Sequence, residues 1–158
     1  MQTVGLTALV EKLKLKNLTP EVDMSDTVIT TPNINRPALQ LAGYFDHFAS
    51  DRVQIIGYVE YTYLKHLTIE QRLPIYERFL SSEIPCVIFS SRTEPDDEFL
   101  KLAVKHNKPL LASDQETSPF MAECIRALST MLAPWIAMHG VLVGVYGEGV
   151  RLMGESGV

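Results

Sequence analysis

The chain has 158 residues, of which 46% are hydrophobic and 21% charged, so it can form one domain with a real core and does not resemble a disordered chain. Its 14 Lys and Arg side chains stand against 19 Asp and Glu, a formal net charge of -5, and this acidic balance argues against nucleic acid as a partner. No apolar run reaches the roughly 18–20 residues of a membrane span, and residues 1–13 lack the pattern of a secretory signal, which argues against a membrane partner and predicts a cytoplasmic protein.

The first third of the chain predicts a helix, a strand and a second, shorter helix. Residues 3–13 carry apolar side chains at helical spacing, which predicts a short amphipathic helix. The β-branched run 28–31 predicts a strand. Pro37 suits the first turn of the following helix, in which we expect Leu39 and Ala42 to face inward.

The middle of the chain predicts a second strand and a capped helix. The run 53–59 is rich in β-branched and apolar residues and contains a glycine, which predicts a strand with a bulge or an end at that glycine. Thr68 and Gln71 have the spacing of a capping box, and apolar residues continue one helical face to Leu80. Pro74 should distort the first turns of this helix.

In the second half of the chain, short apolar runs alternate with helical patterns. Residues 86–89 and 109–112 are continuous apolar runs of strand length, the form taken by strands buried on both faces of a parallel sheet. Helices are expected to open at Pro95 and at Ser118, and we interpret the carboxylates of the run 94–98 as stabilising a helix start instead of binding a metal. This βαβα order predicts an α/β fold, a small three-layer domain with a short, mainly parallel sheet.

Helical periodicity stops at Pro134, and the pattern changes to that of a β-hairpin. Residues 139–153 predict its two strands, with residues 147–149 as the turn. We therefore expect an amino-terminal α/β domain over residues 1–130, and a linker with the first strands of another domain over residues 131–158.

The two cysteines, Cys86 and Cys124, lie in apolar stretches and lack the close spacing with His or Cys that zinc sites show. We interpret both as buried free thiols. No metal site is therefore predicted in this chain.

The last five residues, Gly154, Glu155, Ser156, Gly157 and Val158, directly follow a predicted strand, as a phosphate-binding loop does. A complete loop reads G-x-x-x-x-G-K-[ST]: its backbone amides surround the phosphates, its lysine neutralises their charge and its hydroxyl holds Mg²⁺. The chain contains the first glycine and the four interior positions of such a loop. Taken alone, these residues fit equally well a flexible tail that contains glycine.

His139 is a second candidate for function. It precedes the predicted hairpin and lies fifteen positions before Gly154, so a two-stranded ribbon could return it toward the loop. A histidine there could exchange protons near neutral pH or, when charged, pair with phosphate. The alternative is a structural histidine at a strand edge.

Several segments together resemble the HPr kinase/phosphorylase family. One is Asn35-Arg-Pro-Ala-Leu-Gln-Leu-Ala-Gly-Tyr-Phe-Asp46, and another is Ile84-Pro-Cys-Val-Ile-Phe-Ser90. Others cover residues 52–57, 60–64, 139–150 and 154–158. The similarity spans essentially the whole chain, and these ordered motifs together are far more specific than any one of them.

The resemblance implies a bifunctional regulator of carbon catabolite repression in the phosphotransferase system. The parent protein would phosphorylate a serine of the phosphocarrier HPr with ATP or pyrophosphate, require Mg²⁺, and remove the phosphate by phosphorolysis. It would be a homo-oligomer, a hexamer, whose active sites and assembly contacts lie mainly in the C-terminal domain. Residue by residue, His139 matches the family's active-site histidine, and Gly154 to Val158 match the first part of its phosphate loop.

We therefore expect this chain to be the non-catalytic amino-terminal portion of such an enzyme, ending inside the phosphate loop, with the hairpin beginning the missing kinase domain. Alone it should be inactive and need no cofactor. The alternative is a free-standing α/β module that binds a partner or senses a small ligand without catalysing a reaction. A pocket at the carboxyl ends of the strands would favour that alternative.

Overall fold

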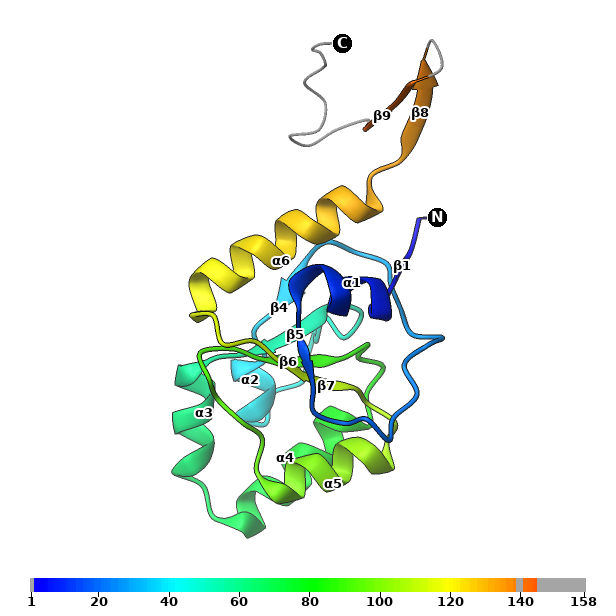
Figure 1. Ribbon diagram of the computed structural model, residues 1–158. Helices are drawn as coiled ribbons and strands as arrows, with labels where there is room; N and C mark the ends of the chain where they lie inside the picture. The colour runs from blue at the N-terminus through cyan, green and yellow to red at the C-terminus, as the bar shows by residue number, and fades with distance from the viewer. Residues whose placement is uncertain (1, 139–140, 145–158) are drawn as a thin grey trace.

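The computed structural model describes residues 2–138 and 141–144 and contains a five-stranded sheet between two layers of helices (Figure 1). From one edge to the other, the strands are β2 (Lys16–Asn17), β7 (Leu110–Ala112), β6 (Val87–Phe89), β5 (Val53–Ile56) and β4 (Ile34–Asn35). Strands β4 to β7 pair in parallel, and β2 pairs antiparallel with β7. The predicted α/β fold with a mainly parallel sheet is confirmed.

Helices cover both faces of this sheet, which gives the molecule three layers. One face carries α1 (Leu6–Leu13) and α6 (Thr117–Leu132), and the other carries α2 (Ala38–Leu41), α3 (Tyr58–Lys65), α4 (Ile69–Leu80) and α5 (Asp97–Lys105). Cys86, which directly precedes β6, and Ile88 pack under α1 and α6, whereas Val87 and Phe89 pack under the opposite layer, because successive side chains of an extended chain alternate. No helix in the described part of the chain is long and apolar enough to cross a membrane.

The connections explain why four helices share one face. Strands β4, β5, β6 and β7 are neighbours in the sheet in the same order as in the chain, and α2 to α5 lie in the connections between them. Right-handed crossovers that step in one direction place every connecting helix on the same side. The helix that follows β7, α6, covers the other side together with α1.

A second, two-stranded sheet extends the layer of α1 and α6. Strand β1 (Val4–Gly5) pairs antiparallel with β3 (Val28–Ile29), and Val4 and Ile29 are buried in the same core as the apolar face of α1. The helix predicted within residues 3–13 and the strand predicted within residues 28–31 are both present, although the strand is shorter than the β-branched run.

The strand predicted within residues 53–59 ends at its glycine, which is one of the two outcomes that the sequence left open. Strand β5 stops at Ile56, and Gly57 is the N-cap of α3. The N–H of Gly57 donates a hydrogen bond to the carboxylate of Glu60 at 2.9 Å, the reciprocal contact of a capping box. The helix begins here because Glu60 stabilises its first turn, although the aromatic and β-branched residues around it favour a strand.

Helix α2 is only four residues long, and its apolar side chains are arranged differently from the prediction. Leu39 is 62% exposed, whereas Leu41 and the amide of Gln40 are buried. The side-chain amide of Asn35 donates to Gln40 at 3.3 Å and to Gln54 at 2.8 Å. This buried amide network turns Gln40 inward, and Leu39 consequently faces solvent.

Helix α4 begins at the cap that the sequence predicts, whereas α5 begins at Asp97, two residues after the expected start at Pro95. The N–H of Gln71 donates to the hydroxyl of Thr68 at 3.2 Å, and the N–H of Thr68 donates to the side chain of Gln71 at 2.8 Å. Helix α4 continues through Pro74 to Leu80. At α5 the carboxylate of Asp96 accepts the N–H of Phe99 at 2.8 Å, so this part of the acidic run caps a helix.

Two further strands follow α6. Strand β8 (Trp135–Met138) pairs antiparallel with β9 (Val141–Gly144), and in Figure 1 the pair lies beyond the end of α6, away from the five-stranded sheet. The pairing begins earlier than the hairpin predicted from residue 139, and the turn predicted at 147–149 lies outside the described residues. The domain boundary expected after residue 130 stays a prediction.

Candidate functional site

The carboxyl ends of strands β4 to β7 meet at one edge of the sheet, which we call the carboxyl edge. The residues that leave these strands are Arg36 after β4, Gly57 after β5, Ser90 after β6 and Ser113 after β7. Open α/β sheets bind their ligands in crevices at this edge. The polar groups at the carboxyl edge are therefore the candidate ligand-binding groups of this fold.

A bidentate ion pair joins Arg36, which follows β4, to Glu60 in α3, the helix that follows β5. The guanidinium of Arg36 donates from Nε to Glu60 Oε2 at 2.9 Å and from Nη2 to Oε1 at 2.6 Å. The Glu60 side chain is 3% exposed and that of Arg36 is 32% exposed. Because the N–H of Gly57 also donates to Glu60, the buried carboxylate is fully paired, and the contact fixes the start of α3 against the loop after β4.

Gly57 lies where no side chain fits. A Cβ built at this position would lie 2.5 Å from the hydroxyl of Thr117 and 2.8 Å from Nη2 of Arg36. The close approach brings the start of α6 against the end of β5. The glycine that the sequence marks as a strand end is therefore required by packing across the carboxyl edge.

Three hydroxyl groups connect the end of β6 to the start of α6. The hydroxyls of Ser90 and Ser91 each lie 2.8 Å from that of Thr117, and the N–H of Thr117 donates to the Ser91 hydroxyl at 3.0 Å. Ser90 is fully buried, and its N–H donates to the carbonyl of Ile56 at 2.9 Å. The loop after β6 is thus tied to both β5 and α6.

Ser91 and Arg92 are consecutive residues with left-handed backbone conformations, at φ of 56° and 57°. Such a conformation costs a residue with a Cβ about 1–3 kcal/mol and persists only where the surroundings impose it. Here the N–H of Ser91 donates to the carbonyl of Gln115 at 2.7 Å, and both the N–H and the hydroxyl of Thr93 donate to Ser90. These hydrogen bonds therefore hold the loop in a strained backbone conformation next to solvent. Strained backbone conformations cluster at binding sites.

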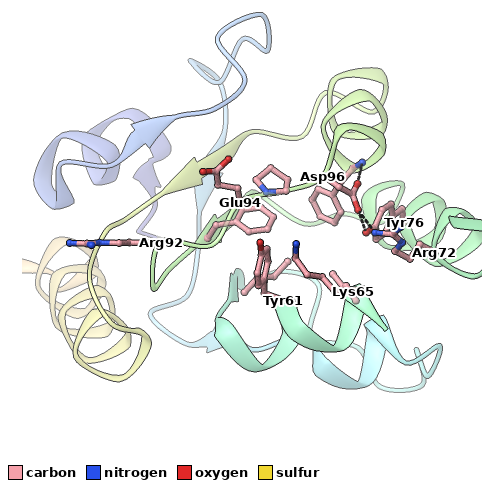
Figure 2. Close-up of a pocket in the computed structure, with 12 residues that line it drawn as sticks. Tyr61, Lys65, Arg72, Tyr76, Arg92, Glu94 and Asp96 are labelled. Atoms are coloured by element: carbon pink, nitrogen blue, oxygen red, sulfur yellow. Dashed lines mark hydrogen bonds and ion pairs between the residues drawn. The ribbon is translucent and has the colours of Figure 1, made fainter. Parts of the chain in front are cut away.

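A cavity of about 320 Å³ opens beside this loop, between α3, α4 and the start of α5 (Figure 2). We call it the α3–α5 cavity; its lining residues are Ile56, Tyr61, Leu64, Lys65, Arg72, Tyr76, Phe89, Arg92, Glu94, Pro95, Asp96 and Phe99. Tyr61 and Lys65 extend side by side from α3 toward the loop that carries Glu94. Ile56 and Phe89 are the last residues of β5 and β6, so the cavity lies at the carboxyl edge.

One wall of the cavity is an aromatic cluster with a single polar contact. The ring centroids of Tyr76 and Phe99 are 4.9 Å apart, and those of Phe89 and Phe99 are 5.5 Å apart. The Tyr76 hydroxyl donates to Oδ2 of Asp96 at 2.6 Å, and burial, together with this contact, raises the pKa of Tyr76 well above its usual value. Tyr76 is therefore a fixed hydrogen-bond donor and not a group that titrates near neutral pH.

The cavity is lined by three cationic and two acidic side chains. Arg72 donates from Nη1 to Oδ2 of Asp96 at 2.9 Å, so one carboxylate is neutralised. The Nε–H of Arg72 is buried and has no hydrogen-bond partner within the described residues. The ammonium of Lys65 lies 4.7 Å from the ring centre of Tyr61. Figure 2 shows the guanidinium of Arg92 extending away from the cavity, so the two remaining cations are balanced by the two acids.

The residues that the sequence singled out for chemistry all come from the segment 139–158. His139 and Gly154, Glu155, Ser156, Gly157 and Val158 all lie outside the described residues. Within residues 2–138 and 141–144, no group of three His, Cys, Asp or Glu side chains is placed to hold a metal ion.

Both cysteines are buried free thiols in the core under α1 and α6, as predicted. Burial raises the pKa of Cys86 far above its usual value and raises that of Cys124 to about 12. Neither thiol is therefore a nucleophile at neutral pH.

The cavity could not be found from residue spacing. Its charged residues come from α3, α4 and the loop 92–96, segments that are separated in the chain and become neighbours only in the folded sheet. The one signal in the sequence was the acidic run 94–98, in which Asp96 proves to be both a helix cap and the partner of Arg72.

Comparison with protein families gives one match over most of the chain. The family model described as HPr Serine kinase N terminus matches residues 4–128. The chain is 49% identical over 158 residues to the HPr kinase/phosphorylase of Lachnoclostridium phytofermentans, covering 100% of this chain and 51% of that protein. It is 46% identical over 156 residues to the HPr kinase/phosphorylase of Caldicellulosiruptor bescii, and the match covers 99% of this chain and 50% of that protein. The chain thus spans about half the length of the curated relatives it matches.

Among solved structures, the chain is similar to the CBS and DRTGG domains of the regulatory region of Clostridium perfringens pyrophosphatase, crystallised with the activator diadenosine tetraphosphate. The TM-score is 0.50 at 15% sequence identity, and the match covers 77% of this chain and 45% of that one. At this identity the likeness shows a shared fold alone.

Proposed function

The chain belongs to the HPr serine kinase N-terminus family, and on this premise we propose that it is the non-catalytic amino-terminal half of an HPr kinase/phosphorylase. The complete enzyme would phosphorylate a serine of the phosphocarrier HPr with ATP or pyrophosphate and Mg²⁺ and remove that phosphate by phosphorolysis. It would act in the cytoplasm, in carbon catabolite regulation, as a homo-oligomer with six subunits. The observation that carries the proposal is the match of residues 4–128 to the N terminus of this family.

The division between the two halves follows from what phosphoryl transfer requires. Catalysis of this kind rests on positioning and electrostatic stabilisation by a phosphate-loop lysine, Mg²⁺-binding carboxylates and a group that handles the serine proton. By resemblance, these groups lie beyond residue 158. In this half, His139 would assist near the transferred phosphate, and residues 154–158 would begin the phosphate loop.

Two tests address the residues assigned by resemblance. Reading the gene beyond Val158 should give Gly-Lys-Ser or Gly-Lys-Thr next, which completes the loop; unrelated residues would remove residues 154–158 from the proposal. In a protein extended to the full length of the relatives, His139→Ala should lower the kinase and phosphorolysis rates at least ~100-fold. Rates close to those of the unchanged protein would exclude His139 from the mechanism.

The proposal that this half is non-catalytic has a direct test. The purified 158-residue chain is incubated with HPr, Mg²⁺ and either ATP or pyrophosphate, and the full-length Lachnoclostridium phytofermentans relative serves as the control under the same conditions. We expect phosphorylated HPr only in the control. Phosphorylation of HPr by the 158-residue chain above background would contradict the proposal.

A second candidate function is the sensing of a small ligand by this half. The observation that favours it is the α3–α5 cavity, which lies at the carboxyl edge where open α/β sheets bind ligands. A ligand that binds only the folded state stabilises it by RT ln(1 + [L]/Kd), so the unfolding temperature rises with the logarithm of the ligand concentration above Kd. A screen of small phosphorylated compounds by thermal unfolding should therefore find a stabilising ligand; indifference to all of them would favour a docking role.

A further inference from the structure

The connections that leave two neighbouring strands turn to opposite faces of the sheet. The chain leaves β6 toward α5, on the face that carries α2 to α5, and leaves β7 toward α6, on the face that also carries α1. Open α/β sheets bind ligands in the crevice at the carboxyl ends of two strands whose connections diverge in this way. The crevice between the ends of β6 and β7 is therefore the position of this sheet that is expected to bind a ligand.

A cleft of about 380 Å³ lies at this position, between the loop 92–95 after β6 and residues 112–114 at the end of β7. We call it the β6–β7 cleft. The loop 92–95 is a wall that the cleft shares with the α3–α5 cavity. Figure 2 shows the guanidinium of Arg92 extending away from Tyr61 and Lys65, the side chains that α3 contributes to that cavity. The Arg92 side chain therefore belongs to the β6–β7 cleft.

Hydrogen bonds hold the two walls of the cleft in place. The N–H of Ser91 donates to the carbonyl of Gln115 at 2.7 Å, which joins the loop after β6 to the loop after β7. The N–H of Ser113 donates to the carbonyl of Phe89 at 2.8 Å, and the Ser113 hydroxyl accepts the N–H of Gln115 at 3.2 Å. The backbone of the cleft is thus preorganised, so a ligand does not have to order these loops when it binds.

Charged side chains of both signs line the cleft, two cations and two acids: Lys16, Arg92, Glu94 and Asp114. All four residues are exposed. Within the part of the chain that the structure describes, none of these side chains makes an ion pair or a hydrogen bond. The two buried or half-buried ion pairs elsewhere at the carboxyl edge, by contrast, are already formed inside the chain. The charges of the cleft are therefore available to a ligand.

A zwitterion suits this arrangement better than an ion of a single sign. The two carboxylates of the cleft repel an anion about as strongly as the two cations attract it, and the reverse holds for a cation. A ligand that carries one carboxylate and one ammonium can face each charged group of the cleft with the opposite charge. The α-amino acids carry this pair of charges at neutral pH.

The cleft also has an apolar lining, which comes from Leu18, Pro95, Leu100 and Ala112. Leu18 and Leu100 are partly buried and pack against the core under α3, α4 and α5. An apolar side chain of a ligand that contacts these residues is removed from water, which favours binding. The volume of about 380 Å³ is at the lower end of small-molecule pockets and suits a compound of the size of an amino acid.

We propose that the β6–β7 cleft binds a free α-amino acid with an apolar side chain. The carboxylate of the ligand pairs with Lys16 and Arg92, its ammonium pairs with Glu94 and Asp114, and its side chain lies against the apolar lining. The inference goes beyond both candidate functions, since neither of them gives this cleft a ligand.

The test is a calorimetric titration of the 158-residue chain with L-leucine, L-methionine and L-phenylalanine. We expect saturable binding of at least one of these amino acids. The absence of saturable binding of all three would overturn the proposal.

Two analogues of the amino acid that binds most tightly test whether both of its charges are recognised. One analogue lacks the carboxylate and the other lacks the ammonium, so each leaves two charged side chains of the cleft without a counter-ion. Both should bind at least about tenfold more weakly than the amino acid. An analogue that binds as tightly as the amino acid would overturn the proposal.

Four variants locate the site. Arg92→Gln removes one cation from the cleft and Asp114→Asn removes one acid, and each should weaken amino-acid binding about tenfold. Lys12→Gln and Glu70→Gln are the matched controls, because both residues are exposed and neither lines the cleft; each should change the affinity less than about twofold. Circular dichroism verifies that each variant is folded. Unchanged affinity in both cleft variants would place the amino acid elsewhere in the chain and overturn the proposal.

This test and the test of HPr phosphorylation fail separately. The absence of amino-acid binding would remove the ligand of the cleft but leave the chain a non-catalytic half of the enzyme. Phosphorylation of HPr by this chain would remove the non-catalytic function but leave the cleft and its ligand in place.

Discussion

The two faces of the central sheet are built differently. Under α1 and α6, the core is mostly aliphatic, contains both cysteines and is closed. Under α3, α4 and α5, the core is an aromatic cluster that ends at a cavity with charged walls. We call these the closed face and the open face. The contrast indicates that the closed face mainly stabilises the fold, whereas the open face presents charged groups where a ligand can reach them.

The largest expected effect concerns the thiols of the closed face. Burial raises the pKa of Cys124 to about 12 and that of Cys86 further still, so at pH 8 the thiolate fraction is at least about 1,000-fold below that of an exposed thiol. Iodoacetamide should therefore modify the folded chain at least about 1,000-fold more slowly than the chain unfolded in urea, as followed by mass spectrometry. Rapid modification of either thiol in the folded chain would show that this face opens.

A pair of phenylalanine substitutions compares the faces directly. Phe120 on the closed face and Phe99 on the open face are each 1% exposed, and replacing either by alanine should lower the free energy of unfolding by about 3–5 kcal/mol, measured by urea denaturation. Only Phe99→Ala should also weaken amino-acid binding, since Phe99 adjoins Leu100 in α5, and Leu100 lines the β6–β7 cleft. If Phe120→Ala weakened amino-acid binding equally, the two faces would not be separable.

The ion pair at the carboxyl edge tests what holds the open face in place. Arg36→Leu leaves Glu60 buried without its cation, which should cost about 3 kcal/mol, the lower end for a broken buried pair because Arg36 is partly exposed. The exposed pair between Lys101 and Glu98, at 3.7 Å, provides the control. Lys101→Gln should cost at most about 0.5 kcal/mol. Equal, small costs in urea denaturation would show that the buried pair is dispensable.

The smallest expected effect is at the start of α4. Thr68→Ala removes the hydroxyl that accepts the N–H of Gln71 and should cost about 1 kcal/mol, with amino-acid affinity unchanged because Thr68 does not line the β6–β7 cleft. Thr68→Ser keeps the hydroxyl and should remain close to the unchanged chain in urea denaturation. A loss of amino-acid binding in Thr68→Ala would mean that the cleft depends on the helix start.

Helices and strands could be predicted from the sequence where residues close together in the chain determine the local structure and its burial. The runs 86–89 and 109–112 are apolar on both sides, and they form the central strands β6 and β7. The spacing of Thr68 and Gln71 predicted the start of α4. In each case, the residues that decide the structure are neighbours in the chain.

Predictions were wrong where contacts between distant residues decide the outcome. The end of the strand at Gly57 was one of the predicted outcomes, but helix α3 was missed, because it begins at Tyr58 where Glu60 is buried against Arg36 and caps the helix. Leu39 was expected to face inward, but the bond from Asn35 buries Gln40 instead. The α3–α5 cavity has the same origin, since its cations come from separate segments and no spacing relates them.

The most direct test of the contrast between the two faces is a titration of the ¹⁵N-labelled 158-residue chain with the amino acid that binds most tightly, followed by the chemical shifts of its backbone amides. We expect saturable shifts at residues 92–94 and 112–114, which line the β6–β7 cleft, while the amides of α1 and the middle of α6 stay unchanged. Shifts confined to the closed face, or an unchanged spectrum at saturating amino acid, would contradict the account.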